Sequence, residues 1–338
     1  MGMGNFKISV EQHRGDSYDI GYQQGQQIDR LLLVVYSNIV NEEDIDLEEL
    51  KEIYSSYAPH LFQELSGIAA SMNISLRTAA LFSGFGAPEI QGMGCSSVVN
   101  HNMLVRNYDF SPKAYDARFV FVQPSEGYAS VGHSLHVMGR TEGVNEKGLA
   151  VALHFVNSKD TQNGLTAASV IRIILDTCKN TEEAVNVIKE LPHSWSYNFS
   201  IGDAEGNAVV VEETPFDVKV RKSEGMLFCT NHFQRQDMSI HNRENLEGTK
   251  ERLNYLDQNH LEKIDVQEIF NTFRADKPLY NEEYHEFFGT LHTFAYSFDN
   301  NKVLTAVPAG DVLEIDFNEW VNGRDLNQKE ISGRLNNY

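Results

Sequence analysis

Three cysteines, at positions 95, 178 and 229, are the residues of this chain whose type could supply a thiol nucleophile. Cys95 follows a turn-rich segment, 84–94, with four glycines and one proline in eleven residues, and it opens a strand-like run. A second strand-like run ends in RNYDF, at 106–110. If a turn at 100–103 joins the two runs, Arg106 and Asp109 lie near Cys95. A guanidinium can stabilise a thiolate and a carboxylate can hold an amino group, so this hairpin is a candidate thiol site.

The other two cysteines are interpreted as packing residues. Cys178 ends an apolar helical pattern, where a thiol behaves as a small hydrophobic group. Cys229 is followed closely by Asn231 and His232, which gives a second Cys–His–Asn set. Residues spaced in this way along a strand do not all face one pocket, and catalytic triads are assembled from separated segments. This second set is therefore the weaker candidate.

The elements that must position Cys95 are mainly strands. Residues 1–94 are predicted to be mostly helical, with a core-facing apolar stripe over 50–72. After residue 95 the pattern predicts short strands and hairpins, interrupted by two pairs of amphipathic helices. The predicted hairpins span 96–108, 199–212 and 293–307, and the predicted helices span 166–178, 181–191, 249–259 and 266–273. Strands outnumber crossover helices, which favours antiparallel sheets layered with helices over a doubly wound parallel sheet.

Composition narrows the class of protein. The chain has 338 residues, with 28 Lys and Arg against 48 Asp and Glu, a net charge of −20. This balance argues against binding to nucleic acid or to an anionic membrane surface. No apolar run reaches the ~20 residues of a spanning helix, and the first residues lack the apolar core of a signal peptide. We therefore expect a cytoplasmic protein without disulfides, and the oligomeric state is left open, a homo-oligomer included.

Several motifs occur together in one order along the chain. They are GDSYDIGYQQG near the N-terminus, then GCSSVV, RNYDF, GVNEKGLAVALHF, NFSIGDAEGNAVVVE, FCTNHF, and a helix with Arg252. This series resembles the N-terminal-nucleophile hydrolases. The most similar branch is the acyl-CoA:6-aminopenicillanic acid acyltransferase family, related to penicillin V acylases and bile salt hydrolases. The resemblance implies an α+β fold, a four-layer αββα sandwich of two antiparallel sheets between helical layers.

The resemblance also implies roles for the residues that match the motifs. The chain would be a zymogen that cuts itself between Gly94 and Cys95, which divides it into a helical prosegment, 1–94, and a catalytic part, 95–338. Cys95 would be the nucleophile, and its freed α-amine, with a reference pKa of ~7.7–8.0, would be the base. Asp109 would orient that amine, and Arg106 would support the thiolate or contact the substrate. Asn231 would donate to the oxyanion, and Arg252 would lie near the site.

One position departs from the pattern of the relatives. The bile salt and penicillin V enzymes have Asn or Tyr at a second oxyanion position, and His154 stands there in this chain. A main-chain N–H would serve whatever the side chain. This difference therefore bears on the substrate more than on the mechanism.

The expected activity is hydrolysis of a linear, non-peptide amide, or acyl transfer, through a thioester on Cys95. The substrate would be a small-molecule amide, no cofactor or metal is implied, and the two fragments would stay associated. The alternatives are a penicillin V or bile salt acylase specifically, and an uncut, non-catalytic binding protein. The sequence contains neither an HExxH motif nor a glycine-rich nucleotide loop.

Overall fold

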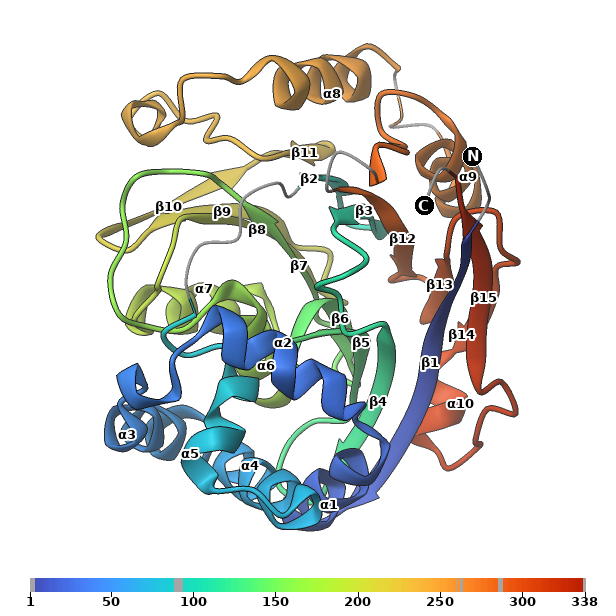
Figure 1. The fold of residues 1–338 in the computed structure, drawn as a ribbon. Helices are drawn as coiled ribbons and strands as arrows, with labels where there is room; N and C mark the ends of the chain where they lie inside the picture. Colours follow the sequence, from blue (N-terminus) through green and yellow to red (C-terminus); the bar gives the residue numbers. More distant parts are fainter. Residues whose placement is uncertain (1–3, 88–93, 260, 262–263, 285–287, 337–338) are drawn as a thin grey trace.

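The computed structural model describes residues 4–87, 94–259, 261, 264–284 and 288–336. In these residues two β-sheets form the centre of the molecule, and helices cover both outer faces (Figure 1). No helix in the described part of the chain has the length and apolar character needed to cross a bilayer.

The larger sheet has nine strands, and all neighbours are antiparallel except β1 and β4, which run parallel. In spatial order the strands are β10 (Asp217–Lys222), β9 (Ala208–Thr214), β8 (Tyr197–Gly202), β7 (Ala150–Phe155), β6 (Gly139–Asn145), β5 (Ser130–Leu135), β4 (Arg118–Pro124), β1 (Gly4–Gly15) and β15 (Glu330–Leu335).

The smaller sheet has six strands and is antiparallel throughout. In spatial order they are β11 (Leu227–Cys229), β2 (Gly94–Val99), β3 (Met103–Phe110), β12 (Gly289–Ser297), β13 (Lys302–Ala306) and β14 (Leu313–Asp316). Strands β2 and β3 pack face to face against β7 and β8 of the larger sheet. The predicted hairpins at 96–108, 199–212 and 293–307 are confirmed as β2–β3, β8–β9 and β12–β13.

Helices form the two outer layers. On the larger sheet lie α6 (Ala167–Thr177) and α7 (Thr181–Glu190), and on the smaller sheet lie α8 (Glu247–Gln258) and α9 (Val266–Ala275) (Figure 1). The remaining helices are α1 (Ser17–Gln27), α2 (Arg30–Ile39), α3 (Leu47–Tyr57), α4 (Pro59–Met72), α5 (Leu76–Ala79) and α10 (Phe317–Val321). The four layers αββα predicted from the resemblance are confirmed, with the parallel β1–β4 pair as one exception to the antiparallel order.

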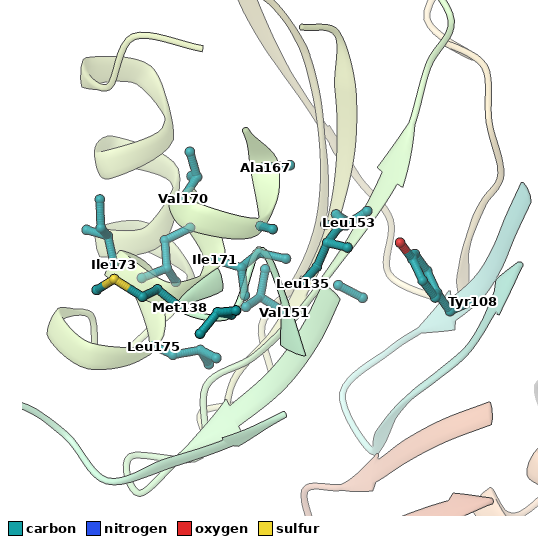
Figure 2. Close-up of a cluster of buried hydrophobic side chains, with 14 of the residues drawn as sticks. Tyr108, Leu135, Met138, Val151, Leu153, Ala167, Val170, Ile171, Ile173 and Leu175 are labelled. Atoms are coloured by element: carbon teal, nitrogen blue, oxygen red, sulfur yellow. The ribbon is translucent and has the colours of Figure 1, made fainter. Parts of the chain in front are cut away.

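Helix α6 shows why the layers hold together. Its apolar side chain Ile171 lies toward Val151 and Leu153 of β7 (Figure 2). These three side chains are at most 1% exposed. Burying each one contributes about 1.5–3 kcal/mol, so this contact alone fastens the helical layer firmly to the sheet.

The described part of the first 94 residues, 4–87 and 94, is mostly helical, as predicted, but it also contains a strand that was not predicted. Strand β1 lies between β4 and β15, so it joins the chain's last strand to the sheet. Two buried ion pairs tie the same segment to the rest of the molecule, Glu11 with Arg118 at 2.7 Å and Glu64 with Arg172 at 2.6 Å. The division at residue 94 stays a prediction.

Candidate active site

The β2–β3 hairpin brings the three predicted residues of the thiol site together. In its register Cys95 lies opposite Tyr108, Gly94 opposite Asp109, and Ser97 opposite Arg106. Residues two apart on a strand share a face, so Arg106 reaches diagonally toward Cys95. Its Nη2 lies 3.0 Å from the Cys95 Sγ, and both side chains are fully buried. The predicted approach of Arg106 to the thiol is therefore confirmed.

The ionisation of that thiol differs from the sequence-based expectation. Arg106 was expected to support the thiolate form of Cys95. Burial instead raises the pKa of the Cys95 thiol, and the attraction of Arg106 offsets only part of this rise. The sequence carries no direct measure of desolvation, which penalises the charged form of a buried thiol. Cys95 is thus mainly protonated at neutral pH and needs a base to become a nucleophile.

The main-chain nitrogen of Cys95 has a polar partner of its own. It donates to Asn231 Oδ1 at 2.7 Å, and Arg252 Nη2 donates to the same oxygen at 2.7 Å. Asn231 Nδ2 donates to the Phe155 carbonyl at 2.9 Å. Two donors on one side and a carbonyl on the other fix the orientation of the amide. Asn231 therefore holds the Cys95 nitrogen here, and its Nδ2 carries a second hydrogen besides the one that it donates to the carbonyl of Phe155.

Asp109 completes the polar surroundings of the Gly94–Cys95 bond. Arg252 Nη1 donates to its Oδ2 at 3.3 Å, and Thr290 Oγ1 donates to its Oδ1 at 2.7 Å. Burial raises the pKa of Asp109, and Arg252 and Thr290 counter part of that rise. Arg252 is only 9% exposed on α8, so it is not a surface charge. Thr290 lies 181 positions from Asp109, and nothing in the local sequence marked it.

His154 lies on β7, at the interface between the two sheets. It lies opposite Asn198 in the β7–β8 pair, and Asn198 donates to the carbonyls of Thr230 and His232, so both side chains face the smaller sheet. His154 is fully buried, and neither ring nitrogen has a hydrogen-bond partner in the described part of the chain. Burial, helped by the charge of Arg106, holds the pKa of His154 well below its usual range. The ring is a neutral group with one free donor and one free acceptor.

A cavity of about 560 Å³ borders the bond before Cys95. Gly94 and Arg252 form part of its wall, with Asn157 and Arg243 nearby. The wall carries both signs of charge, because Arg243, Arg252 and Lys277 face it together with Glu251, Glu282 and Glu283. A small polar molecule in this cavity would lie beside the backbone of Gly94.

The other two cysteines do not join this site. Burial raises the pKa of both Cys178 and Cys229 to about 12. The Cys229 thiol lies 3.6 Å from the Thr230 carbonyl, whereas His232 Nδ1 contacts the hydroxyls of Thr230 and Thr249. Among the contacts of the described residues, His232 thus serves hydroxyl groups and not the Cys229 thiol.

A family model describes most of the chain, over residues 98–311. The chain belongs to the acyl-coenzyme A:6-aminopenicillanic acid acyl-transferase family. The matched span begins three residues after Cys95 and includes Arg106, Asp109, Asn231 and Arg252. The predicted family is confirmed. None of the curated proteins matches the chain.

Three examples illustrate the solved structures that are similar to this acyl-transferase family member. A mutant of conjugated bile acid hydrolase from Clostridium perfringens is 15% identical, with a TM-score of 0.48 and coverage of 71% of this chain and 95% of that chain. Penicillin V acylase from Agrobacterium tumefaciens is 16% identical, with a TM-score of 0.41 and coverage of 67% of this chain and 86% of that chain. The Caenorhabditis elegans ortholog of N-acylethanolamine-hydrolyzing acid amidase is 14% identical, with a TM-score of 0.41 and coverage of 60% of this chain and 93% of that chain.

Proposed function

We propose that the protein is a self-processing N-terminal cysteine amidohydrolase or acyltransferase that acts on a linear, non-peptide amide. One observation carries this proposal: the Cys95 thiol lies 3.0 Å from a buried guanidinium while the Cys95 nitrogen lies 2.7 Å from Asn231 Oδ1. The nucleophile and the nitrogen that would become its base are thus both held, on one residue. Membership of the acyl-transferase family supports the same chemistry.

Self-processing would begin within the intact chain. The Cys95 sulfur attacks the Gly94 carbonyl carbon, its proton passes to the Cys95 nitrogen, and the C–N bond breaks to leave a thioester. Water hydrolyses this thioester, which yields the carboxylic acid of Gly94 and restores the thiol beside a free α-amine. Such an amine accepts a proton near neutral pH, which a buried thiol with a raised pKa requires.

The reaction on a substrate would reuse the same atoms. The α-amine takes the thiol proton, the sulfur attacks the amide carbonyl, and the proton then passes to the leaving amine. The acyl group remains as a thioester, which either water or a second amine resolves. Asn231 holds the nitrogen that becomes the α-amine, Asp109 would orient this amine after the cut, and Arg252 bridges Asn231 and Asp109. The free ring nitrogens of His154 and the main chain beside it are the proposed oxyanion contacts.

The small fragment would remain bound after the cut. It contains β1, which is hydrogen-bonded on both edges to strands of the large fragment. It also contains Glu11 and Glu64, whose buried ion pairs would be broken by separation. Separating the fragments would therefore expose two sheet edges and four unpaired charges, which is strongly unfavourable.

A panel of acyl amides tests the activity. We expect the processed protein to release amine from at least one class, with phenoxyacetyl and fatty acyl amides as the first members. Mass spectrometry of the protein during turnover should detect the acyl group on the fragment that begins with Cys95. The same panel with Cys95→Ala gives the background. Processed protein that turns over no amide, with or without an added acceptor amine, would leave the binding-protein alternative.

Gly94 offers a second test, because there is no room for a side chain at this position. A Cβ on Gly94 would lie 2.7 Å from Asp109 Oδ2 and 2.8 Å from Arg252 Nη1. We expect Gly94→Ala to separate this pair and slow self-cleavage on the order of 100-fold, since small misplacements of reacting groups have effects of this size. The rate is measured on gels from pulse-labelled protein.

Gly248→Ala is the matched control for this substitution. Gly248 lines the same cavity, but a Cβ there would meet no atom within 4 Å. It should be cleaved at the wild-type rate. Equal cleavage of Gly94→Ala and Gly248→Ala would refute a role for the Asp109–Arg252 pair in the reaction.

A further inference from the structure

Behind Arg106, on the side away from Cys95, lies a buried cluster that none of the steps above uses. It consists of Glu142 on β6, His133 on β5 and His292 on β12, so it joins the two sheets. All three side chains are 0% exposed. The two imidazole rings are stacked with their centroids 3.6 Å apart. Burying an ionic group in the protein interior costs free energy unless partners compensate its charge. The contacts of the Glu142 carboxylate therefore indicate its role.

Every contact of Glu142 in the cluster comes from a donor. Its Oε1 accepts from His133 Nδ1 at 2.7 Å, and its Oε2 accepts from His292 Nε2 at 3.1 Å and from Arg106 Nη1. Thr141 Oγ1 donates to the same Oε2 at 2.9 Å. A carboxylate only accepts, so these contacts fix which nitrogen of each ring carries the proton.

The outer nitrogens of the two rings agree with this assignment of protons. His133 Nε2 lies 3.2 Å from the Thr305 hydroxyl, and His292 Nδ1 lies 3.1 Å from the Tyr115 hydroxyl. Each hydroxyl can donate to the ring nitrogen that has no proton. Both imidazoles therefore make two hydrogen bonds while neutral, and they hold the carboxylate in one orientation.

The guanidinium of Arg106 is fixed by the same carboxylate. Nη1 donates to Glu142 and, at 3.3 Å, to the Thr141 carbonyl. Nη2 donates to the Leu153 carbonyl at 2.9 Å, which leaves its other hydrogen for the Cys95 sulfur. The Tyr108 ring lies 4.8 Å from the guanidinium carbon. The position of the nitrogen beside the thiol thus depends on Glu142 and two carbonyls.

The charges of the cluster balance. Burial alone would raise the pKa of Glu142, but His292, Arg106 and His133 together hold it well below its usual range. Burial lowers the pKa of His133, and burial with His133 nearby lowers that of His292 to about 3. The rings are neutral at pH 7, so the one negative charge of Glu142 faces the one positive charge of Arg106.

We propose that Glu142, oriented by His133 and His292, is the positioning residue of Arg106: it fixes the guanidinium beside Cys95 and cancels much of its charge there. The thiol then keeps its proton until the α-amine takes it, and the proton remains available for the leaving amine. This inference rests on the proposed function for its consequence, but the geometry and charge of the cluster can be tested without any substrate.

A metal site is the other use that these ligand types could have. The ligand atoms of His133, Glu142 and His292 lie within 4.8 Å of one another. A divalent cation there would face the guanidinium of Arg106, which already binds Glu142. Both ring nitrogens that point at Glu142 also carry protons in the present network. The ion pair with Arg106 therefore favours the positioning role.

The experiment titrates Cys95 itself. Protein labelled with ¹³Cβ-cysteine gives one NMR signal per thiol, and the shift of each signal with pH reports its ionisation. In Glu142→Gln the charge of Arg106 is no longer balanced, so we expect the Cys95 midpoint to fall by about one pH unit, a tenfold rise in thiolate at a given pH. Cys178 and Cys229 should titrate as in the wild type. Self-cleavage should nevertheless slow about tenfold, because the guanidinium is no longer held in position beside the Cys95 sulfur.

Two further variants distinguish the effects of the charge at position 142, of the position of its carboxylate and of the stability of the fold. Glu142→Asp keeps the charge but withdraws the carboxylate from Arg106, so its Cys95 midpoint should stay within a few tenths of a unit while self-cleavage slows severalfold. Glu64→Gln breaks an equally buried ion pair with Arg172 in the helical layer. It should lower the melting temperature without moving the midpoint or the cleavage rate of folded protein. If Glu142→Gln does not fold, Glu142→Asp carries the test through its cleavage rate.

Three results would overturn the inference. They are a Cys95 midpoint in Glu142→Gln that stays or rises, wild-type cleavage by Glu142→Asp, and a stoichiometric metal in the purified protein by elemental analysis. Failure of the proposed function looks different, because wild-type protein would then never be cut before Cys95. The midpoint shift would still report on Glu142 in that uncut chain.

Discussion

Wild-type protein is expected to separate under denaturing conditions into two polypeptides, residues 1–94 and 95–338, whereas Cys95→Ala remains one chain of 338 residues. The thiol is the group that attacks the Gly94 carbonyl in the proposed mechanism, and the methyl group of alanine cannot replace it. Intact-mass spectrometry distinguishes the outcomes, and sequencing of the large fragment should begin with Cys95. Size-exclusion chromatography without denaturant should show the two fragments eluting together.

The two other cysteines give matched controls for that experiment. Cys178→Ala and Cys229→Ala also remove a buried thiol whose pKa burial raises, yet both chains should be cut as fast as the wild type. Cys95→Ser should be cut slowly, because a hydroxyl gives up its proton far less readily than a thiol. A wild-type preparation that contains only the intact chain, after long incubation of folded protein, would contradict self-processing.

Replacing Arg106 with methionine is expected to have the second largest effect. The substitution leaves Glu142 buried without its cation, and such losses cost about 3–5 kcal/mol of unfolding free energy. It also removes the donor 3.0 Å from the Cys95 sulfur, so self-cleavage should slow on the order of 100-fold. Denaturant unfolding and the cleavage rate of the folded fraction measure the two effects separately.

The double variant Arg106→Met with Glu142→Gln tests whether the loss of stability and the loss of cleavage rate have different origins. Removing both charges leaves no uncompensated ion in the sandwich, so most of the unfolding free energy should return. Cleavage should stay as slow as in Arg106→Met, because the donor is still missing. A double variant that recovers its cleavage rate together with its stability would mean that Arg106 only supports the fold.

The part of the site that could be predicted from residue spacing is the part built by one hairpin. Arg106 and Asp109 follow Cys95 closely in the chain, and a single turn is enough to bring them back to it. Asn231 and Arg252 come from distant elements, and only the resemblance to a family pointed to them. Thr290 and Glu142 belong to other strands of the sandwich. Their contacts depend on how the sheets stack, which the local pattern does not encode.

The fold, like the site, could be predicted from the sequence only where local patterns determine it. Hairpins and amphipathic helices follow from short periodic patterns, and the structure confirms them. Strand β1, GNFKISVEQHRG, was missed although Phe6, Ile8 and Val10 alternate with polar residues, and its partners β4 and β15 are far away along the chain. The ionisation of Cys95 was expected in the wrong direction for a related reason. The sequence shows the cation nearby but not the burial that outweighs it.

The position of β1 between β4 and β15 bears on how the mature protein would refold. In the uncut chain the insertion of β1 is a step within one molecule, with a rate that does not depend on concentration. Once the bond before Cys95 is cut, the same step joins two molecules, and it becomes slower with each dilution. A processed sample denatured and then diluted should therefore regain little native protein, whereas Cys95→Ala should refold. The lifetime of the mature enzyme would then be set by how slowly it unfolds and not by an equilibrium.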